Sequence, residues 1–511
     1  MAFVLALSLL AEEKVDLNAV HKIKEEAFAN SNVMEYAFYL SDVYGPRLTN
    51  SDNHRKAADW AIEQLTKMGL KNARLETWGP FGRGWKYTKF SAHMIEPAYM
   101  PIIGFPQAWT PGTKGSVEGE PVLVTIKSEA DMENYRGKLK GKIVMEAPIK
   151  ELQMSTTALA YRYTDADLAG EAMAPDPANH GFSMPLNPAA RVSSGRTDGE
   201  QTGTTHMTAL RWKIIGFFAD EGVLAVVNYG DSGDFGTIFA DTAGSPNENF
   251  PAPPPTISIT PEHYNRIARL IAKKMPVKLE LNIGAEFSEA SDSFNVLAEI
   301  PGSDKADEVV MIGAHLDSWH GGTGATDNAA GCAAALEAAR ILIASGVKLR
   351  RTVRIALWGG EEQGLLGSRA YVNEHFRDPQ TLARNEEHAK LSAYFNLDNG
   401  TGKIRGIYMQ GNDRVRPIFE AWLKPVNDLG AATVSIRATA GTDHQPFDAV
   451  GIPAFQFIQD PIEYVTRTQH SNMDLYDRLQ KSDLMQAAAV TAIFLYNSAN
   501  REELLPRMVR P

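Results

Sequence analysis

The second half of the chain alternates short apolar runs with stretches of helical periodicity. From about residue 290, apolar runs of five to seven residues bounded by turn-forming residues predict strands, and the longer stretches between them predict helices. The expected strands are 309–313, 352–358, 391–397, 404–409 and 454–458, and the expected helices are 329–345, 365–375, 413–427 and 482–497. This alternation is typical of an α/β fold with a mostly parallel central sheet flanked by helices.

The first 290 residues have a different pattern of apolar and polar positions. Apolar positions at helical spacing predict a helix from Asn53 to Leu70, and residues 72–120 have the pattern of strands and loops. Short strands are expected at 121–126, 142–146 and 223–228, with a helix at 208–221. Residues 165–206 are rich in Gly, Pro, Ser, Thr and Asn and favour a long surface loop.

These changes in the pattern predict one main domain, formed by two separate parts of the chain, and a second domain inserted between the two parts. The first part is expected at 25–118, a mainly-β inserted domain at 119–285, and the second part at 286–511. Residues 1–24 are expected to be a leader remnant or a disordered N-terminus. Their first eleven residues are like the apolar part of a secretion signal, which points to a secreted or periplasmic protein.

Composition narrows the class of protein. The 511 residues are 44% hydrophobic and 22% charged, which is ordinary for globular domains. The net charge of −11 argues against a nucleic-acid partner, and no apolar run is long enough to predict a membrane span. The single cysteine, Cys332, excludes an intrachain disulfide.

Polar side chains collect where the predicted strands end. The residues concerned are His315, Asp317, Asp327, Glu361, Glu362, Asp398 and His470. Ligands of open α/β sheets bind beyond the carboxyl ends of the strands, so these side chains are expected at one edge. Each alone has an ordinary reading, such as a helix cap, a turn residue or a solvated charge pair.

Together, these residues predict a metal centre. Carboxylates crowded in this way repel one another unless cations neutralise them. Two histidines with three carboxylates, one of them bridging, suit a pair of Zn²⁺ ions, for which Co²⁺ or Mn²⁺ could substitute. Such a pair can hold a shared hydroxide and polarise a carbonyl, while a free carboxylate moves the proton.

Five ordered motifs resemble those of the di-zinc exopeptidases of metallopeptidase family 28. They are the segments 313–318, 324–331, 359–364, 396–399 and 468–471. The likeness covers about 35–118 and 285–500, and the layout is most similar to carboxypeptidase Q-type members. The middle of the chain resembles a protease-associated domain, most clearly at 135–144 and 220–226.

The resemblance implies a role for each residue. Asp327 would bridge two zinc ions, with His315 and Asp398 completing one site and Glu362 and His470 the other. Glu361 would be the general acid/base for hydrolysis of dipeptides or short peptides at a chain end.

Two further features of the site follow from the same resemblance. Asp317 would hydrogen-bond the far ring nitrogen of His315 and so fix its tautomer. The peptide bond between Asp327 and Asn328 would be cis.

The substrate pocket is less defined. Asp443 and His444 lie in a segment that resembles a pocket-lining loop, and a turn capping a helix is the alternative. Many relatives carry Tyr before the last His ligand, where this chain has Gln469, so Tyr464 is the candidate replacement. Arg467 could bind a substrate carboxylate or be a solvated charge.

Several alternatives stay open. Asp443, Asp460 or Glu463 could instead bind a substrate ammonium, so the sequence does not separate aminopeptidase, carboxypeptidase and dipeptidase. Hydrolysis of N-acyl amino acids, glutaminyl cyclisation and a non-enzymatic receptor-like role are the other functions considered. The partner expected is a peptide or amide small molecule, and a homodimer is left open.

Overall fold

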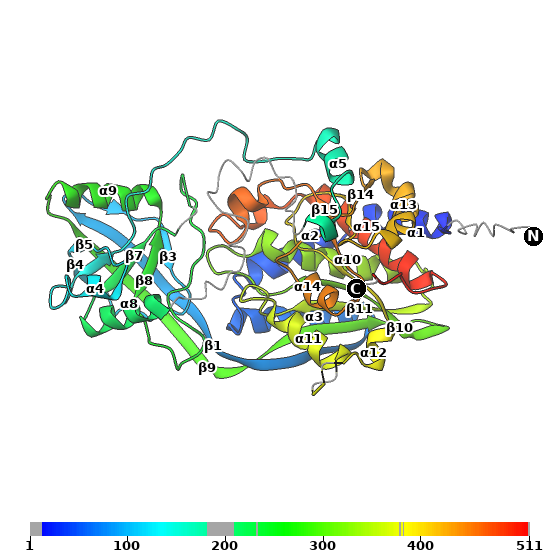
Figure 1. Cartoon of the computed structure of the whole chain (residues 1–511), viewed down its shortest axis with the longest axis horizontal. Coiled ribbons are helices and arrows are strands. Elements are labelled where there is room, and N and C mark those ends of the chain that lie inside the picture. The colour runs from blue at the N-terminus through cyan, green and yellow to red at the C-terminus, as the bar shows by residue number, and fades with distance from the viewer. Residues whose placement is uncertain (1–12, 181–208, 231–232, 378–379, 382, 509–511) are drawn as a thin grey trace, which may run out of the picture.

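The computed structural model describes residues 13–180, 209–230, 233–377, 380–381 and 383–508. These residues form a large and a small lobe joined by a long two-stranded ribbon. In Figure 1 the small lobe lies at the left, and the ribbon runs from it into the large lobe. The ribbon consists of β1 (Lys71–Glu96) and β9 (Lys278–Ile300), which pair antiparallel from Lys71 to Glu96. The sequence pattern of 72–120 indicated strands but not one strand continuous across both lobes.

A ten-stranded mixed sheet runs through the large lobe, and the β1–β9 ribbon carries it into the small lobe, where β2 and β4 pair with the ribbon. Its order is β14-β13-β15-β12-β10-β11-β9-β1-β2, with β4 paired to β9. The middle strands β15, β12, β10 and β11 are parallel, and the antiparallel pairs lie toward the two sides. The further bounds are β2 (Met100–Pro101), β4 (Val117–Gly119), β10 (Lys305–His315), β11 (Arg351–Trp358), β12 (Leu391–Asn396), β13 (Ile404–Tyr408), β14 (Thr433–Ser435) and β15 (Ala454–Gln459).

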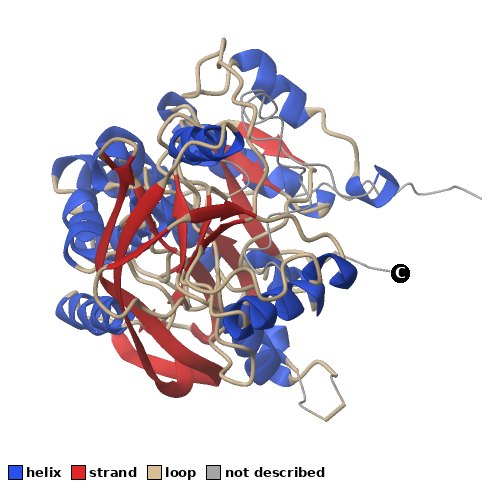
Figure 2. Ribbon diagram, turned by 90° about the vertical axis from the view of Figure 1, so that its left-hand side faces the viewer, coloured by secondary structure: helices blue, strands red, loops and turns tan. Residues whose placement is uncertain are grey.

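Helices cover both faces of this sheet, as Figure 2 shows. One face packs against α1 (Leu17–Ala29), α2 (Val33–Phe38), α3 (Asp52–Lys67), α10 (Ala330–Ala344), α13 (Arg416–Leu423) and α15 (Lys481–Asn500). The other face packs against α11 (Leu366–Phe376), α12 (Glu386–Lys390) and α14 (His444–Ala449). The expected α/β fold with a central sheet between helices is confirmed.

Helix α10 shows why this packing is close. Twelve of its residues are buried, six of them alanine, and Glu337 is the one charged side chain among the twelve, so most of the helix circumference is apolar. Small side chains let α2, α15 and the sheet approach it together. The predicted helix over 413–427 is shorter, because tighter turns at 413–415 and 424–429 flank α13.

The small lobe is built on a five-stranded sheet of order β3-β8-β7-β6-β5. Its elements are β3 (Gly104–Pro106), β5 (Pro121–Leu123), β6 (Ile143–Met145), β7 (Ala225–Asn228), β8 (Thr256–Ile259), α4 (Glu129–Met132), α8 (Ala209–Asp220) and α9 (Pro261–Ala272). The lobe is thus mixed α/β rather than mainly β, because α8 and α9 bury apolar faces against the sheet. Strand β3 also extends it beyond the expected range 119–285.

Two expectations about irregular structure are corrected. The predicted loop 165–206 contains α5 (Asp165–Ala172), whose capping box joins Thr164 and Asp167, and the short α6 (Pro177–His180). Its remainder from residue 181 lies outside the described residues.

The expected leader or disordered segment 1–24 includes the start of α1. Asp16 caps this helix by accepting from the N–H groups of Asn18 and Ala19, at 3.0 and 3.1 Å. Residues 1–12 lie outside the described part. Across the described residues, no helix combines the length and apolar character needed to cross a membrane.

The packing of α1 predicts unequal effects for two of its apolar residues. Ile23 is fully buried against the core shared with α15, whereas Leu17 is 64% exposed. We expect Ile23→Ala to lower the free energy of unfolding by about 2–5 kcal/mol, because it leaves a cavity. The matched Leu17→Ala should stay within about 0.5 kcal/mol of the unsubstituted chain. Urea unfolding followed by circular dichroism measures both, and equal effects would show that α1 does not contribute to the core.

Candidate metal centre

The topology brings the predicted residues to one edge of the central sheet. His315 ends β10, Glu361 and Glu362 follow the end of β11, and Asp398 follows the end of β12. These three strands are parallel neighbours, so their carboxyl ends meet. Asp327 lies in the turn 325–329 before α10, and His470 in the loop after β15. The peptide bond Asp327–Asn328 is cis, as expected.

Asp327 lies between two groups of side chains that could each hold a metal ion. One group is His315, Asp327 and Asp398, and the other is Asp327, Glu362 and His470. His315 Nε2 lies 3.1 Å from Asp327 Oδ1 and 3.3 Å from Asp398 Oδ1. His470 Nε2 lies 3.2 Å from Asp327 Oδ2 and 2.9 Å from Glu362 Oε2. The two carboxylate oxygens of Asp327 therefore face opposite groups.

Burial and like charge dominate the electrostatics of this cluster. Burial, together with the neighbouring carboxylates, raises the pKa of Glu361 and of Glu362 well above the usual range. Burial lowers the pKa of His315, but Asp398, Glu361 and Asp327 outweigh this effect and raise it well above normal. Asp327 Oδ2 and Glu362 Oε1 are buried without a hydrogen-bond partner. Such a cluster is stabilised when cations occupy it.

The role predicted for Asp317 is corrected in its detail. The His315 Nδ1–H donates to the backbone carbonyl of Asp317 at 2.9 Å, while the Asp317 carboxylate is 3.8 Å from that nitrogen. The carboxylate instead accepts from the backbone N–H groups of Glu361 and Glu362, both at 3.2 Å, and from the Thr49 hydroxyl at 2.9 Å. Its side chain thus orients the glutamate pair, and its main chain orients His315.

Sequence reasoning missed Asp474, a buried carboxylate that holds the turn carrying Asp327. It accepts from the Thr326 N–H at 2.6 Å, the Thr326 hydroxyl at 2.7 Å and the Asp327 N–H at 3.1 Å. Burial and the nearby Asp327 raise its pKa to about 7. Its position four residues after His470 was the only available signal, because an acidic loop residue by itself has no distinctive pattern.

Tyr464 lies at the cluster, as the sequence suggested. Its hydroxyl donates to Asp398 Oδ1 at 3.2 Å. Arg467, in contrast, turns to the small lobe, where its Nη1 donates to the Thr237 hydroxyl at 2.5 Å and its Nη2 lies 4.0 Å from Asp234.

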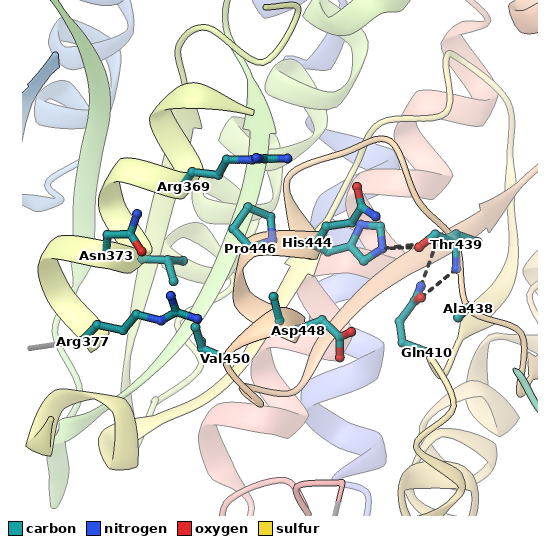
Figure 3. Close-up of a pocket in the computed structure, with 13 residues that line it drawn as sticks. Arg369, Asn373, Arg377, Gln410, Ala438, Thr439, His444, Pro446, Asp448 and Val450 are labelled. Atoms are coloured by element: carbon teal, nitrogen blue, oxygen red, sulfur yellow. Dashed lines mark hydrogen bonds between the residues drawn. The ribbon is translucent and has the colours of Figure 1, made fainter. Parts of the chain in front are cut away.

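The structure separates Asp443 and His444. Asp443 is fully buried and accepts from the Ser368 hydroxyl at 2.5 Å, and burial raises its pKa to about 7. His444 borders a cavity of about 510 Å³ between α11 and α14, where its Nε2 contacts the Thr439 carbonyl at 3.1 Å (Figure 3). None of the residues lining that cavity belongs to either metal-binding group.

Comparison with known proteins finds similarity to metallopeptidases. Residues 295–495 match the model of peptidase family M28. Carboxypeptidase Q from Bos taurus is 26% identical over 486 residues, which are 94% of this chain and 88% of that protein.

Two solved structures are similar along nearly the whole chain. The peptidase M28 precursor from Shewanella amazonensis is 25% identical with a TM-score of 0.66, and the match covers 96% of this chain and 99% of that one. A zinc aminopeptidase from Bacillus subtilis shares the fold at 19% identity and a TM-score of 0.56, covering 92% and 95%. The family match spans the residues that carry the cluster, and over residues 295–495 the chain is similar to peptidase family M28.

Proposed function

We propose that this chain is a di-zinc exopeptidase that hydrolyses dipeptides or short peptides at a chain end. The observation that supports this most directly is the position of Asp327. Its Oδ1 lies 3.1 Å from His315 Nε2 and its Oδ2 lies 3.2 Å from His470 Nε2, as expected of a carboxylate that bridges two ions.

The residues present fit two zinc ions. Each group offers one imidazole nitrogen and two carboxylate oxygens, a donor set that suits Zn²⁺ and also accepts Co²⁺ or Mn²⁺. The carboxylates of Asp327 and Glu362, whose buried oxygens Oδ2 and Oε1 lack a hydrogen-bond partner, would then have a cation to offset their charge. When bound, the two ions would supply Lewis acidity toward a substrate carbonyl.

Glu361 is the proposed general acid/base. Its carboxylate belongs to neither metal-binding group, but its backbone N–H is bound to Asp317 beside Glu362. In its ionised form the Glu361 carboxylate, which is not needed as a metal ligand, would take a proton from the attacking water and hold it until the amine leaves. The Tyr464 hydroxyl, which donates to Asp398 here, would donate to a developing oxyanion if it turned from that carboxylate toward the substrate.

The charge around the site favours a substrate ammonium. The carboxylates of the site are Asp317, Asp327, Glu361, Glu362, Asp398, Asp443 and Asp474. When ionised, they outnumber the charges that two divalent cations and the guanidinium of Arg47 can neutralise. An environment with net negative charge attracts a free amino group and repels a carboxylate.

The other candidate charges are already paired. Asp460 binds Arg162 and Arg405 at 2.9 and 3.0 Å, and Glu463 binds Arg478 at 2.6 Å. Arg467, the candidate for a substrate carboxylate, is bound to Thr237. The proposal is therefore an exopeptidase that requires a free amine. N-acyl amino acid hydrolysis or glutaminyl cyclisation would use the same metals, and the complete ligand set argues against a receptor-like role.

Glu361→Gln tests the assignment of the base. We expect the turnover number to fall about 10²- to 10⁴-fold, because the proton transfer is lost while both metal groups stay intact. Zinc content by plasma mass spectrometry should remain at two ions per chain. Glu362→Gln is the contrasting variant and should lose zinc together with activity. Full turnover by Glu361→Gln would refute its role.

Removal of metal tests the centre itself. A chelator followed by dialysis should abolish peptide hydrolysis, and added Zn²⁺, Co²⁺ or Mn²⁺ should restore it. Calorimetry should also show a lower Tm for the metal-free chain, because an ion at 1,000 times its Kd stabilises the folded state by about 4 kcal/mol. Hydrolysis that persists after complete metal removal would contradict the proposal.

A matched set of dipeptides tests the substrate class. We expect cleavage of the free and C-amidated forms and none of the N-acetylated form, because the site favours an ammonium. Amine release measured with and without chelator gives the result. Cleavage of the acetylated but not the amidated form would instead indicate a carboxypeptidase or an aminoacylase. If no form is cleaved, the peptidase proposal fails and other amides become the candidates.

A further inference from the structure

The loop that carries His470 is bound to the small lobe between Arg467 and Asn472. The backbone N–H of Ala240 donates to the carbonyl of His470 at 2.6 Å, and Phe239 forms a β-bridge with Ser471. Arg467, at the start of the loop, donates to the Thr237 hydroxyl at 2.5 Å. The segment Gly236–Ala240 of the small lobe thus runs beside residues 467–472, and we call this segment the clasp.

Asn472 makes the most contacts with the clasp. Its Oδ1 accepts from the Ile238 N–H at 2.7 Å, and its Nδ2 donates to the Gly236 carbonyl at 3.0 Å. Its own backbone N–H donates to the Ile238 carbonyl at 3.0 Å. An asparagine side chain that bonds both a donor and an acceptor of one segment fixes its position and its orientation together.

The backbone of His470 needs such support. Its φ is 59°, in the left-handed region that residues other than glycine rarely adopt. Residues keep such a conformation when surrounding contacts over-determine it. The carbonyl of His470 is held by the clasp, while its ring nitrogen Nε2 lies 2.9 Å from Glu362 Oε2.

We propose that the clasp positions His470, so that the site formed by Asp327, Glu362 and His470 binds its ion tightly only while the small lobe holds the loop. Asn472 is the positioning residue that carries this coupling. The inference rests on the proposed di-zinc function, and it assigns the inserted lobe a part in building the metal centre. The other site, with His315 and Asp398, has its imidazole fixed from within the large lobe through Asp317.

The test is a zinc titration of the full chain. Metal-free protein is equilibrated with buffered free Zn²⁺, and bound zinc per chain is measured by plasma mass spectrometry. We expect Asn472→Ala to bind one of its two ions about 10- to 100-fold more weakly than the unsubstituted chain, as is typical when a group that orients a ligand is removed. The other ion should bind with unchanged affinity.

The matched control is Asn265→Ala in the small lobe. Asn265 also makes two side-chain bonds to backbone, accepting from the Lys150 N–H at 2.9 Å and donating to its carbonyl at 2.7 Å. It is not part of the clasp, so both zinc ions should keep their affinity. Should Asn472→Ala fail to fold, Thr237→Val removes only the hydroxyl bound by Arg467 and should weaken the same ion to a smaller extent.

The outcomes separate the two proposals. Two tightly bound ions in Asn472→Ala and in Thr237→Val, or an equal loss in Asn265→Ala, would overturn the clasp and leave the di-zinc function standing. An unsubstituted chain that does not bind a pair of zinc ions would overturn the di-zinc function, and the clasp with it.

Discussion

The burial of so many carboxyl groups beside one another is the constraint on which the rest of the site depends. Asp327 lies in the middle, with Glu362 and Asp398 on either side, and the side chains of all three are almost inaccessible to solvent. Like charges at these distances destabilise a low-dielectric site unless protons or cations compensate them. Burial and repulsion from the neighbouring carboxylates together raise the pKa values of Glu361 and Glu362.

Hydrogen bonds, mostly from main-chain N–H groups, offset part of the free energy that burial of these carboxylates costs. Asp474 accepts three bonds from Thr326 and Asp327, and Asp317 accepts from the backbone of the glutamate pair. Neither carboxylate is a proposed metal ligand, and each binds the backbone of a segment that carries one. They hold the ligand-bearing turns in place before any ion binds, which reduces the ordering that binding requires.

The two lobes differ in what they contribute to the centre. The large lobe supplies the proposed ligands from the ends of β10, β11 and β12 and from two loops. The small lobe, which the β1–β9 ribbon joins to the large lobe, supplies backbone contacts to the loop of His470. It also contacts the loop that follows β10, since His320 Nε2 donates to the Pro106 carbonyl at 2.7 Å.

The sequence by itself determined the order of strands and helices in the large lobe, because apolar runs and helical spacing reflect local burial. It also predicted most residues of the cluster, though not Asp474, because parallel strands place the residues after their carboxyl ends at one edge. His315, Asp327 and Asp398 were predicted in this way.

Only the tertiary structure decided which partner each side chain takes. The contacts of Asp317 with the glutamate backbone, of Arg467 with Thr237 and of Asn472 with the clasp join segments far apart in the chain. Helix α1 and the continuous β1–β9 ribbon were missed for the same reason. The ribbon depends on pairing between segments about 200 residues apart, which neither segment specifies by itself. Helix α1 has apolar residues at helical spacing, but its stability comes from packing against α10 and α15.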